Sequence, residues 1–297
     1  MPCRPRHWAV GCVQIRKGAL TRLAVAVPML TRSTQPYWDK AAETYDQVFT
    51  HTLIGQAERN AVWRELGRVF HSGQRILELN CGTGVDAAHL AETGVRVLAC
   101  DIAPRMIEMA RQRVGSTGLG QLIDFRVLAT EDIAALGDEG PFDGAFSNFA
   151  GMNHVEDLSA VARNLAQLLR PGARVLLCML GRFTPWEVGL HLVHGRPSKT
   201  VERFQRGGTI HQHADNVILK THYPSVGDMV RMFEPGFRLC EWMGVGIALP
   251  PSYLESWARR FPWALEQLAN VDRWLGRLPG LRGMGGHILL QFERMPG

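Results

Sequence analysis

Three features are missing from this 297-residue sequence. Its six cysteines form no C-x-x-C pair and show no metal-ligand spacing, which argues against structural zinc and suits a reduced, cytoplasmic protein. No repeat or low-complexity tract occurs, so a solenoid or fibrous array is excluded. The apolar stretch Leu20–Leu30 is too short to span a bilayer, so no transmembrane segment is predicted. These absences indicate a globular protein.

Acidic residues are also missing from residues 1–32, which contain six Arg or Lys side chains. The rest of the chain has 27 basic and 28 acidic residues, so the net charge of +5 belongs to this leader and gives no reason to expect a nucleic-acid partner. The leader could be a transit peptide, a weak amphipathic membrane contact, or sequence upstream of a true start at Met29. We favour the last and predict that residues 1–28 are poorly ordered and dispensable.

What is present is enough apolar residues for a sizeable core. At 46% hydrophobic content, the chain fits one enlarged α/β domain over residues 33–297 better than two independent domains.

A nucleotide-binding βαβ unit dominates the pattern. Residues 76–79 form a short apolar strand, Gly82 and Gly84 allow a turn that approaches a ligand closely, and a helix follows over Val85–Glu92. The next strand delivers Asp101 at its carboxyl end, where a carboxylate can accept hydrogen bonds from both ribose hydroxyls. The pattern predicts a nucleoside-bearing ligand.

The turn alone leaves the cofactor class open. Gly82-x-Gly84-x-x-Ala87 also matches the dinucleotide fingerprint of NAD(P)-dependent oxidoreductases. Additional information comes from Glu78 just before the turn and from Pro104-Arg105-Met106, which opens the next helix.

This run resembles the class I S-adenosylmethionine (SAM)-dependent methyltransferases. Their first motif is E-x-G-x-G-x-G, their second strand ends in an acid, and D-x-S-P-x-M often follows. Asn80 and Ala103 stand here in place of the middle glycine and the serine. Asn tolerates left-handed backbone angles better than most residues, so we expect the turn to survive.

Further motifs follow in the order of the same family. The fourth strand, residues 144–147, precedes a loop containing His154-Val155, and a helix over 158–169 precedes Arg170-Pro171-Gly172-Ala173 and a strand over 174–180. This resembles the small-molecule "type 11" group, similar to ubiquinone-menaquinone methyltransferases, and the likeness covers roughly residues 36–180. The loop lacks an N-P-P-Y motif, which argues against DNA adenine or protein glutamine as the acceptor.

The resemblance implies a Rossmann-like, doubly wound α/β fold with a seven-stranded mixed sheet. Two insertions are expected: a lid with a helix and a hairpin at about 182–224, after strand 5, and a helical segment at about 250–284, between strands 6 and 7. We expect the aromatic side chains of the second insertion to pack on the sheet rather than line the substrate pocket, with Tyr253 as a possible exception.

The resemblance also implies SAM as the cofactor. The expected cofactor-binding residues are Tyr45, Glu78, Asn80, Cys81, Gly82, Gly84, Asp101, Ile102, Met106, Thr130, Glu131, Asn148 and Phe149. Tyr45 could equally belong to an amphipathic helix that packs on the sheet.

The catalytic candidates lie near the expected methyl donor. His154 is the hypothetical general base, although a structural hydrogen bond explains it at least as well, and Asn148, His222 and Tyr223 are further candidates. The other histidines lack nearby Cys or carboxylate ligands, so no metal site is predicted.

The sequence therefore predicts methyl transfer from SAM to a small, moderately hydrophobic molecule by in-line displacement. The alternatives are an NAD(P)-dependent Rossmann oxidoreductase and a non-catalytic SAM-binding protein. The acceptor atom and the oligomeric state are not fixed by the sequence.

Overall fold

The computed structural model describes residues 34–115, 117–195, 201, 203–204, 208–212 and 218–296. The predicted leader, and with it the expected disorder of residues 1–28, lies outside the described residues. None of the helices in the described part of the chain is both long and apolar enough to cross a bilayer.

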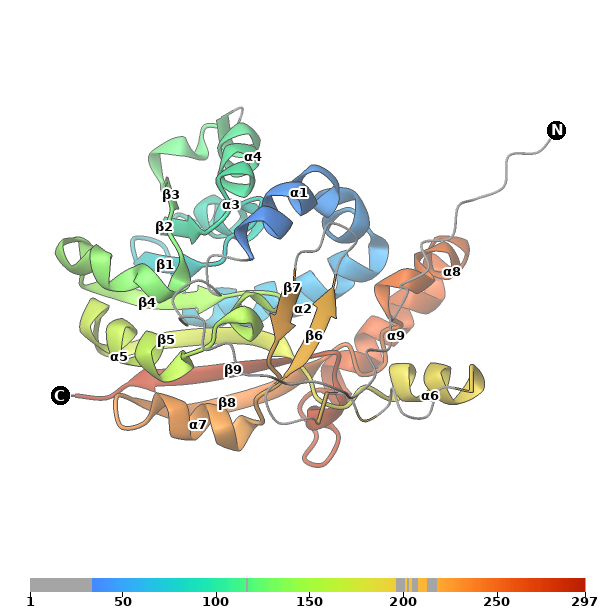
Figure 1. Ribbon diagram of the computed structural model, residues 1–297. Coiled ribbons are helices and arrows are strands. Elements are labelled where there is room, and N and C mark those ends of the chain that lie inside the picture. The colour runs from blue at the N-terminus through green and yellow to red at the C-terminus, as the bar shows by residue number, and fades with distance from the viewer. Residues whose placement is uncertain are drawn as a thin grey trace, which may run out of the picture.

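A seven-stranded mixed sheet forms the centre of the molecule (Figure 1). Its order is β3-β2-β1-β4-β5-β9-β8, with β9 antiparallel to both β5 and β8 and all other neighbours parallel. This confirms the predicted fold class. The strands are β1 (Arg75–Leu79), β2 (Arg96–Asp101), β3 (Ile123–Val127), β4 (Phe142–Ser147), β5 (Leu169–Leu180), β8 (Phe237–Val245) and β9 (His287–Arg294).

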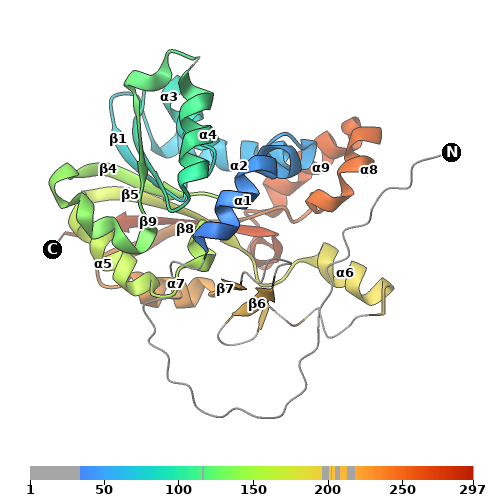
Figure 2. The ribbon, with the colours of Figure 1, turned by 45° about the horizontal axis from the view of Figure 1, so that its top comes forward.

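Helices cover both faces of the sheet, so its central strands are buried on both sides (Figure 2). Successive residues of β1 alternate between two cores: Ile76 packs with α2, α3 and α4, whereas Leu77 and Leu79 pack with α5 and α7. The helices are α2 (Leu53–Val69), α3 (Val85–Glu92), α4 (Pro104–Gly115), α5 (Leu158–Leu168) and α7 (Val226–Phe233).

The start of the fifth strand differs from the prediction. Arg170–Ala173 was expected to form a turn before a strand that begins at residue 174, but β5 already begins at Leu169, which pairs with Phe142 of β4. The register then shifts before Gly144 pairs with Arg174, and Gly172 takes a left-handed φ of 81° within this irregular stretch. The Pro-Gly signal therefore marks a bulge inside a strand rather than a connection.

The first insertion contains the expected helix and the two strands of the expected hairpin. These are α6 (Pro185–Val193), β6 (Thr209–Gln212) and β7 (Ile218–Thr221), with β6 and β7 paired antiparallel. Its role as a lid stays a prediction.

The second insertion contains α8 (Glu255–Arg260) and α9 (Pro262–Leu275), and the expectation that its aromatic residues pack on the sheet is wrong. Leu265 of α9 joins Ile54 of α2 in a small separate core, so the insertion packs on α2. Trp263 and Trp274 lie on the opposite side of α9 and are 68% and 65% exposed. The aromatic count suggested burial, but helical periodicity places these two rings on the outer face.

One buried carboxylate joins three separate segments. Asp86, in the first turn of α3, accepts hydrogen bonds from Arg59 Nη1 at 2.5 Å, Trp63 Nε1 at 2.6 Å and Asn148 Nδ2 at 3.1 Å. The Arg59 and Asp86 side chains are each only 6% exposed. Burial lowers the pKa of Arg59, but Asp86 and other neighbours more than offset this effect, so the guanidinium stays charged.

We expect Asp86→Asn to lower the free energy of unfolding by about 3–5 kcal/mol, because a buried guanidinium would lose its counter-charge. Urea denaturation measures the change. The control is Glu108→Gln, which breaks an ion pair with Arg105 whose partners are about half exposed and should cost less than about 1 kcal/mol. Equal losses in both variants would contradict the importance of the buried pair.

Candidate active site

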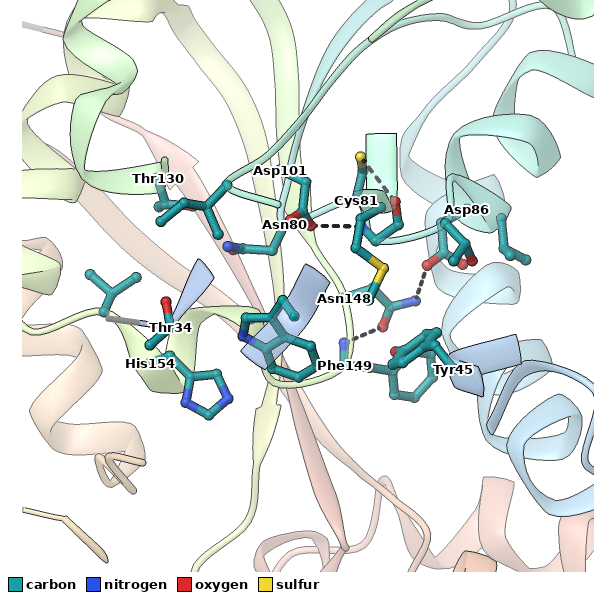
Figure 3. Close-up of a pocket in the computed structure, with 18 of the residues that line it drawn as sticks. Thr34, Tyr45, Asn80, Cys81, Asp86, Asp101, Thr130, Asn148, Phe149 and His154 are labelled. Carbon is teal, nitrogen blue, oxygen red and sulfur yellow. Dashed lines mark hydrogen bonds between the residues drawn. The ribbon is translucent and has the colours of Figure 1, made fainter. Parts of the chain in front are cut away.

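A pocket opens at the carboxyl ends of β1, β2 and β4, where doubly wound folds bind their ligands (Figure 3). Its lining comes from the glycine-rich turn after β1, the end of β2, the loops after β3 and β4, and the first helix. Of the 13 predicted cofactor residues, 11 line it: Tyr45, Asn80, Cys81, Gly82, Asp101, Ile102, Met106, Thr130, Glu131, Asn148 and Phe149.

The turn keeps its left-handed geometry without the usual glycine. Asn80 has φ 56°, as expected for an Asn that replaces glycine there. Gly82 has φ 54°, and a Cβ built on it would meet no protein atom, so the main chain is exposed to the pocket. Gly84 does not line the pocket. A Cβ on it would lie 2.7 Å from Ala110 and 3.0 Å from Phe125. Gly84 therefore allows close packing rather than ligand contact.

Asp101 is held by main-chain donors. Its Oδ2 accepts from Gly82 N–H and its Oδ1 from Ala103 N–H, both at 2.9 Å. Burial raises its pKa to about 6, although these hydrogen bonds favour the charged form. Each carboxylate oxygen keeps a second lone pair that can accept from a hydroxyl group.

Glu78 lies behind the turn and does not line the pocket. It is 1% exposed, and burial raises its pKa well above the ordinary value, with Asp86 adding to the effect. Glu78 therefore belongs to the protein interior beneath the turn and does not contact the ligand space. Burial likewise raises the pKa of the Cys81 thiol, so this residue is not a thiolate nucleophile at neutral pH.

The first helix lies over the pocket and is held there by hydrogen bonds to α4 and to the glycine-rich turn. In α1 (Gln35–Tyr45), Asp39 Oδ1 accepts from Arg105 N–H at the first turn of α4, at 2.9 Å. Asp46, the first residue of the π-helical turn η3 (Asp46–Thr50), accepts from Thr83 Oγ1 at 2.8 Å and pairs with Arg113. These contacts attach the helix to the turn and to α4.

Aromatic residues of this helix form one wall. Trp38 and Tyr45 line the pocket, and the Trp38 ring lies 5.6 Å from the His154 ring, edge to face. Burial raises the pKa of Tyr45 to about 12, so its hydroxyl stays protonated. Tyr45 therefore adjoins the ligand space, as its predicted role requires.

The loop after β4 has an unusual backbone. Phe149 and Ala150 both have positive φ, 46° and 71°, a conformation that costs about 1–3 kcal/mol for each non-glycine residue. The Asn148 side chain stabilises the loop, because its Nδ2 donates to Asp86 and its Oδ1 accepts from Phe149 N–H (Figure 3). Asn148 lines the pocket, but both ends of its amide bond protein groups that shape the loop.

His154 lines the pocket at the end of the same loop, and the first insertion contacts it. Its Nδ1 lies 3.1 Å from the main-chain oxygen of Lys220 in β7. If Nδ1 donates to this carbonyl, the tautomer places the imidazole lone pair on Nε2. The neighbouring Asn153 bonds the insertion too: its Nδ2 donates to the His222 oxygen at 2.6 Å.

His222 and Tyr223 do not line the pocket, so we do not retain them as catalytic candidates. His222 is held through its main chain by Asn153. The Tyr223 ring lies 5.2 Å from the Arg203 guanidinium, and its main-chain oxygen accepts from Arg182 Nε. Both residues thus belong to the framework of the first insertion.

Several lining residues were not predicted, among them Thr34, Arg59, Thr83 and Asp86. Arg59 lies in a helix that the sequence indicated only as core, and its inward direction depends on Asp86, which no local pattern reveals. Asp86 itself could have been found, because an acid in the first turn after a glycine-rich loop lies beside the ligand space by geometry.

Sequence comparison now adds independent information. Residues 76–172 match the family model described as a methyltransferase domain. This part of the chain is therefore a methyltransferase domain. Over 126 residues it is 36% identical to a ubiquinone biosynthesis O-methyltransferase of Xanthomonas axonopodis pv. citri (strain 306), covering 42% of this chain and 51% of that protein. The chain thus spans about half the length of the curated relatives that it matches.

Solved structures share the fold over most of the chain. The DhpI complex with S-adenosylhomocysteine (SAH) has a TM-score of 0.56 at 18% identity, covering 90% of this chain and 98% of that one. The [4+2]-cyclase SpnF has a TM-score of 0.59 at 15% identity, covering 90% and 97%. At these identities the likeness establishes the methyltransferase fold, and the cyclase shows that the fold alone does not fix the reaction.

The structure couples Asn80 to Gly151. A Cβ on Gly151 would lie 2.3 Å from Asn80 Cβ, and Ser147 Oγ donates to Asn80 Oδ1 at 3.1 Å. We expect Gly151→Ala to destabilise the protein by about 1–3 kcal/mol through overpacking, and Asn80→Gly to relieve most of this cost in the double variant. The free energies of unfolding of all four proteins measure the coupling. The control is Gly67→Ala, where a Cβ meets nothing and little loss is expected. Additive costs at 80 and 151 would refute the coupling.

Proposed function

We propose that this protein transfers a methyl group from SAM to a small, moderately hydrophobic molecule in the cytoplasm. The observation that carries the proposal is Asp101 beside a left-handed turn whose main chain faces the pocket, within a methyltransferase domain. A nucleoside cofactor needs a carboxylate that accepts hydrogen bonds from its ribose, and a main chain without side chains that lets the rest of the ligand approach closely.

The residues present fit such a cofactor. Asp101 would hold the ribose hydroxyls, while Thr130 and Glu131 lie at the end of the pocket formed by the loop after β3, where we expect the adenine. Arg59 lines the pocket, and its buried Nε has no hydrogen-bond partner among the described residues. We expect this N–H to bond the carboxylate of the methionine moiety, because an unsatisfied buried donor is costly.

The chain's own task is then mainly positioning. The sulfonium of the cofactor supplies an electrophilic methyl group. Trp38, Tyr45 and Phe149 exclude water from the space beside it, and the rigid loop after β4 fixes one wall. Alignment of the acceptor at near-attack distance contributes up to roughly 7–11 kcal/mol in favourable cases. His154 Nε2 would take the proton of an acceptor that must lose one.

The acceptor atom is proposed from the relatives. They are O-methyltransferases, so a hydroxyl oxygen is the first acceptor to test. The apolar and aromatic pocket walls favour a moderately hydrophobic carrier of that hydroxyl.

We expect the purified protein to bind SAH and not NAD(P), with Asp101→Asn weakening SAH binding about 10- to 100-fold through the loss of charge-assisted hydrogen bonds. Isothermal titration calorimetry measures both. Burial raises the Asp101 pKa to about 6, so a proton competes with the ligand for the carboxylate: SAH affinity should be full above pH 6 and fall up to about tenfold per unit below it.

The asparagine variant provides the control, because its SAH affinity should not show this pH dependence. The free protein should behave oppositely in stability: burial disfavours the charged form, so the contribution of Asp101 falls as pH rises from about 4 through about 6. NAD(P) binding in place of SAH would reject the proposed cofactor.

We expect His154→Gln to slow methyl transfer to a hydroxyl by about 10²- to 10⁴-fold while SAH affinity is retained, because the variant removes a base and not a cofactor contact. Mass spectrometry with deuteromethyl-SAM and a panel of alkylated phenols and catechols measures the rate. Unchanged turnover would remove His154 from proton transfer, whereas SAH binding without transfer to any acceptor would favour a non-catalytic protein.

A further inference from the structure

Exposed apolar side chains are concentrated in the two insertions. Among the described residues 13 large hydrophobic side chains are exposed, and all but Val48 and Val127 lie in residues 186–210 or 253–274. Four are aromatic residues of the second insertion: Tyr253, Phe261, Trp263 and Trp274. An apolar surface confined to insertions, while the rest of the domain shows almost none, indicates an interaction surface.

Charge is segregated in the same way. The two insertions, residues 182–224 and 250–284, contain 11 basic and six acidic side chains. The remainder of residues 33–297 contains 16 basic and 22 acidic ones. Eight of these basic and four of these acidic side chains belong to residues that the structure describes, so the described part of the insertions has a net positive charge, whereas the rest of the domain is negative. A negatively charged partner is therefore favoured at the insertions.

The insertions adjoin one another in space. Trp186 Nε1, in α6, donates to the main-chain oxygen of Ala248, just before the second insertion, at 3.3 Å. In both ribbon views α6 and the α8–α9 pair project from the same end of the molecule (Figures 1 and 2). The exposed side chains of α6 and those of α8 and α9 thus lie at one end of the protein.

The exposed face of α9 shows the chemistry in detail. Trp263, Val271 and Trp274 recur at helical spacing on its outer side. Arg273 is the sequence neighbour of Trp274, and Arg260, the last residue of α8, stands three residues before Trp263. Neither forms an ion pair with another described residue, in contrast to Arg277, whose charge is matched by glutamates. Tryptophan with neighbouring unpaired arginine is the composition that binds at the headgroup level of anionic membranes.

We propose that the two insertions form a surface that docks on anionic lipid bilayers. The indole rings of Trp263 and Trp274 enter the headgroup region, and Arg260 and Arg273 contact lipid phosphates. This docking does not depend on methyl transfer, so the two proposals can fail separately. A second copy of the chain or another protein is the competing occupant of an apolar face, and lipid-free self-association distinguishes it.

The test is co-sedimentation of the full chain with vesicles of phosphatidylcholine alone or mixed with about one-third phosphatidylglycerol, at low ionic strength. We expect binding to the anionic vesicles, weakened at least about tenfold in Trp263→Gln/Trp274→Gln and roughly fivefold for each of Arg260→Gln and Arg273→Gln. Because both indoles are about two-thirds exposed, the fold does not depend on them.

Matched controls are Val127→Gln, at an exposed apolar position outside the insertions, and Arg163→Gln, at an exposed cation on α5. Both should bind like the unmodified chain. Residues 1–32 carry basic side chains but are identical in every variant, so they cannot explain a difference among variants. SAH titration confirms that each variant keeps its cofactor pocket.

Three results would overturn the docking surface. The first is no binding to anionic vesicles, and the second is equal binding by the tryptophan variant and the unmodified chain. The third is self-association in sedimentation velocity without lipid that the tryptophan double variant abolishes, which would assign the surface to a second copy of this chain.

Discussion

A single buried negative charge organises the site. Asp86 takes donors from α2 and from the loop after β4 while lying in the first turn of α3, so the helices on one face of the sheet and the loop at its edge are fixed relative to one another. A buried carboxylate is stable only with its donors in place, and a buried guanidinium only with its anion. The ion pair between Arg59 and Asp86 holds the Arg59 side chain at the pocket wall, where its Nε has no hydrogen-bond partner among the described residues.

Several further interactions build the pocket on the arrangement that Asp86 fixes. The Asp101 carboxylate, at the end of β2, accepts hydrogen bonds from the main chain of the turn after β1 and from Ala103 N–H. Asp39 of α1 caps α4, and Asp46 bonds Thr83 in the turn. The unfavourable angles of Phe149 and Ala150 persist because the Asn148 side chain, itself bonded to Asp86, accepts a hydrogen bond from Phe149 N–H. The result is a preformed crevice, which suits a reaction that depends on alignment.

Strand periodicity and the order of motifs were enough to predict the sheet, the βαβ unit and most of the pocket lining. They failed where side-chain direction depends on tertiary packing. Gly84 looked like a ligand contact, but it lets α4 and β3 pack closely against the turn, and Trp263 looked buried but faces outward. Arg59 carries no local signal, because its role exists only once α2 lies against α3. The Arg170–Ala173 segment reads as a turn, yet a bulge keeps it within a strand.

The contact between Asn80 and Gly151 has a consequence for how this domain can change. Any side chain at 151 collides with the asparagine, whereas a glycine at 80 would leave room for one. Surveys of single substitutions would therefore score position 151 as intolerant, although the two sites are free to vary together. The order in which the substitutions arise then matters: position 80 must lose its side chain before position 151 can gain one.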